Sequence, residues 1–255
     1  MRVTMTPEIT RRSHIREGPL SGASGSLPNH IDEIEGWFYP TDHYLFDWVL
    51  GRHDAASGDL VELGVYMGKS AIYMGRHLRE GETFTVCDLF DTPAPDTRTD
   101  KEMRVYYSTL TRAKFEQNYL RFHDVLPVIV EGPTAMLPSR VTPQSCRFAH
   151  VDASHLYEHV SADIDIVRDL LAPDGVVAID DYRSPHTPGV AAATWEAVLN
   201  KGLRPIVVSE SKFYGTWGDA DRIQFDLLPW LLAHPQLGAE VHRVLGHGLI
   251  RAHHR

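Results

Sequence analysis

The stretch LVELGVYMGKSAIYMGRHL, residues 60–78, decides the fold. Its first part, residues 60–65, is a short apolar run that predicts a buried β-strand. Residues 70–78 then repeat apolar side chains at helical spacing, and the glycines 64 and 68 lie at the junction. A strand that passes through glycines directly into a helix is typical of a βα unit.

The same alternation continues outward from this stretch. Short apolar runs predict further strands at 83–90, 125–132, 147–154, 175–182 and 203–211. Segments of helical length separate most of them, including about 105–121, 159–171 and 190–202. Parallel neighbours need such crossover connections, so we predict an α/β protein with a doubly wound, mostly parallel sheet. The charged segment 91–104 is predicted to be an exposed loop.

The N-terminal flank divides into two parts. A Gly/Ser/Pro-rich stretch ends near residue 28, so residues 1–31 are predicted to form a flexible arm or lid. A Pro-Thr-Asp start signal then leads into a helix with Tyr44 and Trp48 on its apolar side. Residues 32–255 are expected to form a single domain, because a chain of 255 residues can bury one large core.

Composition narrows the classes of partner. The formal net charge is -9 and no basic run stands out, so we expect no nucleic acid. No segment approaches 18 consecutive apolar residues and the N-terminus has no apolar leader, so we expect a cytoplasmic protein without a membrane partner. Cys87 and Cys146 lie inside apolar runs, which favours free thiols over a disulfide.

Gly64, Gly68 and Ser70 form the first candidate binding group. Glycines between a strand and a helix let the backbone approach a ligand, and free N–H groups at the helix start favour a carboxylate or phosphate. Ser70 either donates to such a carboxylate or caps the helix. The glycines alone are equally consistent with a simple turn, and their spacing is not the G-x-G-x-x-G of dinucleotide sites.

Acidic residues mark the predicted strand ends. In an open parallel sheet, ligands bind beyond the carboxyl ends of the strands. Asp88 ends the second strand about 20 residues after the glycines, where a carboxylate can accept both ribose hydroxyls. The alternative for Asp88 is an ordinary residue at the start of a loop. The five strand ends carry Glu62, Asp88, Glu131, Asp152 and the pair Asp180-Asp181.

Asp152, Asp180 and Asp181 form a second candidate group. Converging carboxylates repel one another unless a cation is present, and carboxylate oxygens suit Mg²⁺ better than zinc. Separate loop-capping roles are the alternative. His155 lies three residues beyond Asp152, where a neutral imidazole could remove a proton from a metal-bound hydroxyl. A purely structural His155 is the competing interpretation.

These motifs together resemble the class I S-adenosylmethionine-dependent methyltransferases. Residues 61–78, the Asp152 segment and VVAIDDYRSPHTPG (176–189) carry the resemblance, which covers about residues 35–215. Within the class they are most similar to metal-dependent O-methyltransferases of the catechol type and of the macrocin type, which methylate sugars in natural products. The resemblance implies a seven-stranded sheet with a reversed last strand.

The resemblance also implies roles for individual residues. Gly64, Tyr66, Gly68 and Ser70, preceded by Glu62, match the loop that holds the methionine part of the cofactor. Asp88 matches the ribose-binding acid, and Gly132 and Thr134 match the loop beside adenine. Asp152, Asp180 and Asp181 match the Mg²⁺ ligands, and the Asp pair is closer to the macrocin type. His155 stands where the catechol enzymes have a lysine base.

The sequence therefore predicts Mg²⁺-dependent methyl transfer from S-adenosylmethionine to a hydroxyl of a small-molecule acceptor. The acceptor is a vicinal diol of a natural-product sugar or a catechol-like phenol. Two alternatives stay open at this point: an NAD-dependent oxidoreductase and a non-catalytic cofactor-binding module. Candidate lids are the N-terminal arm, the loop 91–104 and the segment 211–219, whose Tyr214 and Trp217 either stack on the acceptor or belong to the core. A homodimer is the default assembly.

Overall fold

A computed structural model describes residues 30–52 and 58–255. The arm predicted over residues 1–31 lies outside the described residues except for His30 and Ile31. Ile31 begins a short 3₁₀ helix, η1 (Ile31–Glu33), and is buried in the core. Across the described parts of the chain, no helix combines the length and the apolar character that crossing a bilayer requires.

The sheet confirms the α/β prediction. Its parallel strands are β1 (Asp59–Leu63), β2 (Phe84–Asp88), β3 (Val128–Glu131), β4 (Cys146–Val151) and β5 (Leu171–Ile179). Beyond β5 lies β7 (Phe213–Thr216), antiparallel to both β5 and β6 (Arg204–Val208). This is the reversed strand that the resemblance implied. The spatial order is β3-β2-β1-β4-β5-β7-β6-β9-β8.

The described sheet has nine strands where seven were expected. The two additional strands are β8 (Leu237–Val244) and β9 (His247–His254), which form a C-terminal hairpin. Leu245 and Gly246 connect them, both with positive φ (52° and 84°), as a tight two-residue turn requires. β9 joins β6 in parallel and buries Leu249, Ile250 and Ala252, which attaches the hairpin to the sheet.

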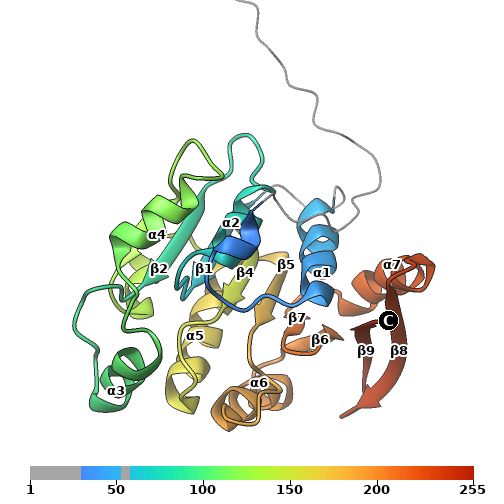
Figure 1. The fold of residues 1–255 in the computed structure, drawn as a ribbon. Helices are drawn as coiled ribbons and strands as arrows, with labels where there is room; N and C mark the ends of the chain where they lie inside the picture. The colour runs from blue at the N-terminus through green and yellow to red at the C-terminus, as the bar shows by residue number, and fades with distance from the viewer. Residues whose placement is uncertain (1–29, 53–57) are drawn as a thin grey trace, which may run out of the picture.

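Helices cover both faces of the sheet (Figure 1). One apolar core joins the sheet to α1 (Pro40–Gly51), α2 (Lys69–Gly75), α4 (Arg112–Tyr119) and α7 (Ala220–Ala233). A second core contains α5 (Tyr157–Leu170), α6 (Pro188–Asn200) and η2 (Thr134–Ser139). Successive residues of β4 serve opposite cores, Phe148 the first and Ala149 the second. The protein therefore has three layers, with the sheet in the middle.

Two local predictions were wrong. The segment 91–104, predicted to be a loop, contains most of the helix α3 (Thr97–Tyr106), and the helix expected over 105–121 is instead α4 alone. Asp96 starts α3 by accepting hydrogen bonds from the backbone N–H groups of Arg98 and Thr99. The second error concerns the proposed lid 211–219, much of which is the internal strand β7 with Tyr214 fully buried.

Candidate functional site

The carboxyl ends of the parallel strands meet at one edge of the sheet. Backbone hydrogen bonds of 2.7–3.0 Å connect the residues that leave neighbouring strands. The donors and acceptors are Gly64 N to Cys87 O, Asp152 N to Leu63 O, Gly132 N to Asp88 O, and Asp180 N to Val151 O. Every strand-end residue that the sequence singled out on these strands is thus brought to the same edge.

The backbone at the end of β1 passes so close to the backbone at the end of β4 that residue 64 must be a glycine. Its φ is +79°, and a Cβ added there would lie 2.2 Å from the carbonyl oxygen of Asp152. The β1–α2 loop can therefore rest directly on the start of the β4–α5 loop only if residue 64 has no side chain. The turn places the candidate cofactor loop against the first candidate metal ligand.

Asp88 holds the β1–α2 loop in place. Its Oδ2 accepts hydrogen bonds from the backbone N–H groups of Val65 (2.7 Å) and Tyr66 (3.2 Å). Its Oδ1 accepts one from Phe90 N (3.1 Å). Burial raises the pKa of Asp88 and the three N–H donors oppose this shift. The carboxylate thus orders the predicted cofactor loop from the adjacent strand.

Glu62 and Ser70 contact each other beneath this loop. The Ser70 hydroxyl donates to Glu62 Oε1 (2.5 Å), and the same oxygen lies 2.7 Å from His150 Nδ1. Glu62 and His150 are both completely buried, and Glu62 Oε2 and His150 Nε2 have no hydrogen-bond partner. The sequence predicted Glu62 and Ser70 as direct cofactor contacts, and here they support the loop through their mutual hydrogen bond.

Gly132 and Thr134 lie at the end of β3, beside β2. Gly132 has φ +138° and donates its N–H to Asp88 O (2.9 Å). The Thr134 hydroxyl donates to Asp163 Oδ1 of α5 (2.5 Å). Burial raises the pKa of Asp163 to about 7, because the Thr134 hydrogen bond offsets the effect of burial only in part.

Asp181 turns sharply after β5. Its φ is +57°, a left-handed conformation that is uncommon for residues other than glycine. Its Oδ1 accepts from the Ser184 hydroxyl (2.5 Å), and its carbonyl oxygen accepts from the Thr187 hydroxyl (2.8 Å). The turn aims the second oxygen of Asp181 at His155, at the start of the β4–α5 connection.

His155 lies between two carboxylates. Its Nε2 is 3.0 Å from Asp181 Oδ2, and its Nδ1 is 2.5 Å from Glu102 Oε1 on α3. Burial lowers the pKa of His155, but the hydrogen bonds to Asp181 and Glu102 outweigh it and raise the pKa to about 10. Both ring nitrogens of His155 therefore face carboxylate oxygens, and its role as base stays a prediction.

Asp180 belongs to a buried charge cluster. It forms an ion pair with the Nζ of Lys212, whose side chain is 1% exposed, and accepts from the Ser211 hydroxyl (2.9 Å). Asp42 of α1 completes the cluster through Tyr214 (2.7 Å). Burial raises the pKa of Asp42 to about 6, and the nearby ammonium of Lys212 limits this shift.

These residues offer two overlapping sets of cation ligands. Donor atoms lie within 4.8 Å of one another in the set His150, Asp152 and Asp180 and in the set Asp152, His155 and Asp181. Among the described residues, the three predicted carboxylates therefore do not form one such set. The orphaned His150 Nε2 and the oxygen-rich surroundings fit a divalent cation at Asp152, which belongs to both sets.

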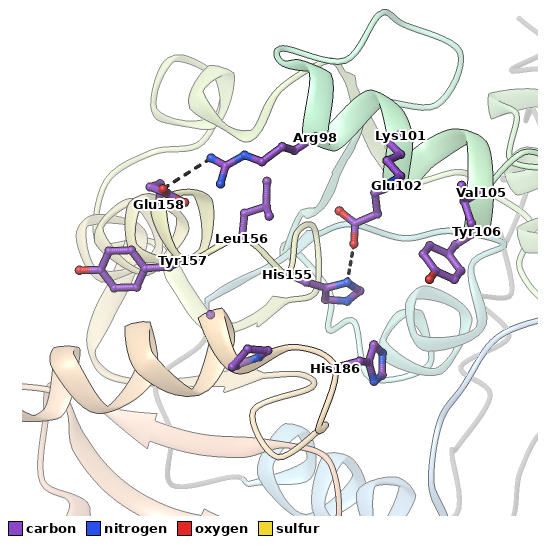
Figure 2. A pocket seen from close by; sticks show the side chains of 12 residues that line it. Arg98, Lys101, Glu102, Val105, Tyr106, His155, Leu156, Tyr157, Glu158 and His186 are labelled. Atoms are coloured by element: carbon purple, nitrogen blue, oxygen red, sulfur yellow. Dashed lines mark ion pairs between the residues drawn. The ribbon is translucent and has the colours of Figure 1, made fainter.

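A pocket of about 610 Å³ opens beside His155. Residues of α3, the start of α5 and the loop before α6 line it, and Glu102 and His155 form an ion pair in its lining (Figure 2). Arg98 of α3 pairs with Glu158 at 3.5 Å along one wall, while Tyr106 stands at the other end of α3. The pocket is large enough for a small-molecule acceptor next to the candidate cation ligands.

Sequence reasoning missed three residues of this site. Lys212 sits alone at the head of an apolar strand, where a single ammonium needs a carboxylate partner. Glu102 lies in the segment that was predicted to be a loop, and the helix cap Asp96 was the available signal. His150 lies on β4, two residues before Asp152, and offers a donor atom close to that of Asp152.

Comparison with known proteins agrees with this geometry. Residues 61–182 match the family model described as a methyltransferase domain. The structure of the O-methyltransferase NovP has 20% sequence identity and a TM-score of 0.52, covering 68% of this chain and 78% of that one. The calicheamicin methyltransferase CalS11 has 21% identity and a TM-score of 0.52, covering 70% and 79%. No curated protein matches the chain.

Proposed function

We propose that this protein transfers a methyl group from S-adenosylmethionine to a hydroxyl of a small molecule. Residues 61–182 match the family model of a methyltransferase domain, and the fold is similar to that of the O-methyltransferase NovP. One observation carries the proposal. Gly64, in the candidate cofactor loop, lies so close to Asp152 that only a glycine fits. A cofactor on that loop and a cation at Asp152 would therefore be immediate neighbours.

The cofactor is proposed to lie along the ends of β1, β2 and β3. The backbone of the loop from Gly64 through Tyr66 to Gly68 faces its methionine part, Asp88 its ribose, and Gly132 with Thr134 its adenine. Glu62 and Ser70 hold the loop from below, since each is already hydrogen-bonded to the other. Their direct contact with the cofactor stays a prediction.

A divalent cation, Mg²⁺ or another hard ion, is proposed at the ends of β4 and β5. The predicted ligands are Asp152, Asp180 and Asp181, and Asp152 belongs to both sets of donor atoms that the structure brings together. When bound, such an ion lowers the pKa of a coordinated hydroxyl and orients two vicinal oxygens of the acceptor. The chain itself contributes orientation: the pocket beside His155 fixes the acceptor, and the Gly64 turn brings the cofactor loop within reach of it.

The reaction is a direct displacement. In such a reaction the acceptor oxygen would bond to the methyl carbon while the sulfur–methyl bond breaks, and S-adenosylhomocysteine would leave. The hydroxyl proton would pass to His155, the predicted base, to a carboxylate or to solvent. Vicinal diols of natural-product sugars and catechol-like phenols are the acceptor classes that two neighbouring oxygens on one cation would select.

Methyl transfer is tested with methyl-labelled S-adenosylmethionine and a panel of sugar diols and catechols. We expect labelled product that is abolished by EDTA and restored by Mg²⁺. Asp181→Ala should lose turnover while binding the cofactor, and Asp221→Ala, an exposed residue on α7, is the matched control. Full activity of Asp181→Ala would exclude the role of the cation. Cofactor binding without any product would favour a non-catalytic module, and an NADH absorbance change an oxidoreductase.

A further inference from the structure

We propose that His155 is a ligand of the cation, together with Asp152 and Asp181, and that Glu102 of α3 positions its imidazole. The inference rests on the proposed function, because it refines the cation site of that reaction. It replaces a ligand set of three carboxylates by a set of two carboxylates and one nitrogen, and it changes His155 from a proton acceptor into a ligand.

The spacing of the donor atoms supports this set. All three residues offer an atom within 4.8 Å of the others, and His155 Nε2 lies 3.0 Å from Asp181 Oδ2. Two adjacent ligands of an octahedral ion with bonds of about 2.1 Å are separated by about 3 Å. A cation between the two atoms needs only small side-chain adjustments.

The second ring nitrogen of His155, Nδ1, contacts a carboxylate, as the second nitrogen of a metal-bound imidazole often does. Its Nδ1 lies 2.5 Å from Glu102 Oε1, and Glu102 and His155 point toward one another in the pocket (Figure 2). A histidine ligand commonly donates its other N–H to a carboxylate, which orients the ring and makes its free nitrogen a better donor. Nε2 is then the atom directed at the cation.

Asp180 is already committed to other groups. Its oxygens accept from the Ser211 hydroxyl (2.9 Å) and the Asp181 backbone N–H (2.8 Å), and one of them pairs with the Lys212 ammonium. A divalent cation bound by Asp180 would lie close to a buried positive charge. The set His150, Asp152 and Asp180 is therefore the less favourable of the two.

The ring of His150 independently indicates that a polar group is bound near Asp152. Its Nδ1 is engaged by Glu62, while Nε2 is fully buried without a hydrogen-bond partner, and the ring lies within the set that includes Asp152. If Nδ1 donates to Glu62, Nε2 needs a donor. A water molecule held on a cation at Asp152 would be such a donor, because hard divalent ions retain part of their water shell.

A nitrogen ligand has a consequence for the choice of ion. Imidazole suits the transition metals, whereas Mg²⁺ prefers oxygen ligands alone. We therefore expect Mn²⁺ to bind the wild-type protein more tightly than Mg²⁺ does. Replacing the positioning residue in Glu102→Gln should weaken Mn²⁺ binding by about tenfold, the usual effect of removing such an outer partner.

The test uses Mn²⁺ alone as the probe, read by pulsed electron paramagnetic resonance and by calorimetry. The expected result is a nitrogen coupling from a directly bound imidazole in the wild-type protein. The coupling should vanish in His155→Gln, and it should persist in the matched control His186→Gln, whose histidine lines the same pocket outside both ligand sets. Circular dichroism of each variant checks that it is folded.

Several outcomes would overturn the inference: bound Mn²⁺ without nitrogen coupling, a coupling that survives in His155→Gln, or no Mn²⁺ binding at all. If a variant does not fold, an all-oxygen spectrum of the wild-type protein still rejects the inference. Failure of the inference is distinguishable from failure of the proposed function. Methyl transfer with an all-oxygen Mn²⁺ spectrum rejects only the inference, and a nitrogen-coupled Mn²⁺ without S-adenosylmethionine binding rejects only the function.

Discussion

At the residue scale, the buried ammonium of Lys212 depends most strongly on its neighbours for its stability. It is 1% exposed, pairs with Asp180 and lies 5.6 Å from the ring centroid of Phe38. The pKa of Lys212 is raised although burial lowers it, because Asp180 and Asp42 together outweigh the burial. Removing one member of such a cluster leaves an uncompensated buried charge.

Lys212→Met should destabilise the protein by about 3–5 kcal/mol, the usual cost of breaking a buried ion pair from one side. Urea unfolding monitored by circular dichroism measures the change. The double variant Lys212→Met/Asp180→Asn should recover part of the loss, since no unpaired ammonium or Asp180 carboxylate remains. A single variant as stable as the wild type would contradict the cluster.

Asp163→Asn should change how stability depends on pH. The pKa of Asp163 is raised to about 7 in the folded protein by burial, above its usual 3.8. Between these two values the folded state binds more protons than the unfolded state, so the Asp163 contribution to stability falls as pH rises from 4 to 7. The variant should therefore melt at a higher temperature than the wild type at pH 8 but not at pH 4. Parallel melting-temperature profiles would argue against this explanation.

At the element scale, α3 differs from the other helices. Thr99 is its only fully buried residue, and polar contacts attach it to the β4–α5 region: Glu102 to His155 (2.5 Å), Asp96 to His159 (3.2 Å) and Arg98 to Glu158 (3.5 Å). Its weak apolar pattern explains why the sequence predicted a loop there.

The β1–α2 turn is the element that depends most on a single residue. Gly64→Ala should destabilise the protein and weaken cofactor binding, since the new Cβ would lie 2.2 Å from Asp152 O. Gly81→Ala is the matched control, because Gly81 also has positive φ (+83°) but open space around it. The control should cost about 1–2 kcal/mol from backbone strain alone. Equal losses in urea unfolding would show that the close approach is unimportant.

At the scale of the whole molecule, the parallel half of the sheet could be predicted because each strand is a short apolar run followed by a helix. The β8–β9 hairpin could not, since Leu245 occupies a turn position where Asn, Asp or Gly is the usual signal. The shared edge of Gly64, Asp88, Asp152 and Asp181 followed from strand direction. The contacts of Lys212 with Asp180 and of Glu102 with His155 could not be predicted, because tertiary packing brings these residues together from distant segments.

The fold places a candidate cofactor loop and a candidate cation site at the same edge of the sheet. The ends of β1, β2 and β3 present a glycine loop ordered by Asp88, and the ends of β4 and β5 present side chains that could hold a cation. Gly64 and Asp152 join the two halves. Methyl transfer needs this proximity, because a sulfonium methyl and an acceptor oxygen react only when aligned at short range.

The most direct test of this account is a calorimetric titration of the full chain with S-adenosylmethionine, with Mg²⁺ and then with EDTA, and with NAD as a parallel ligand. The account predicts micromolar binding of S-adenosylmethionine and none of NAD. Binding of NAD alone, or of neither nucleoside under any metal condition, would contradict it and leave the edge of the sheet without its proposed cofactor.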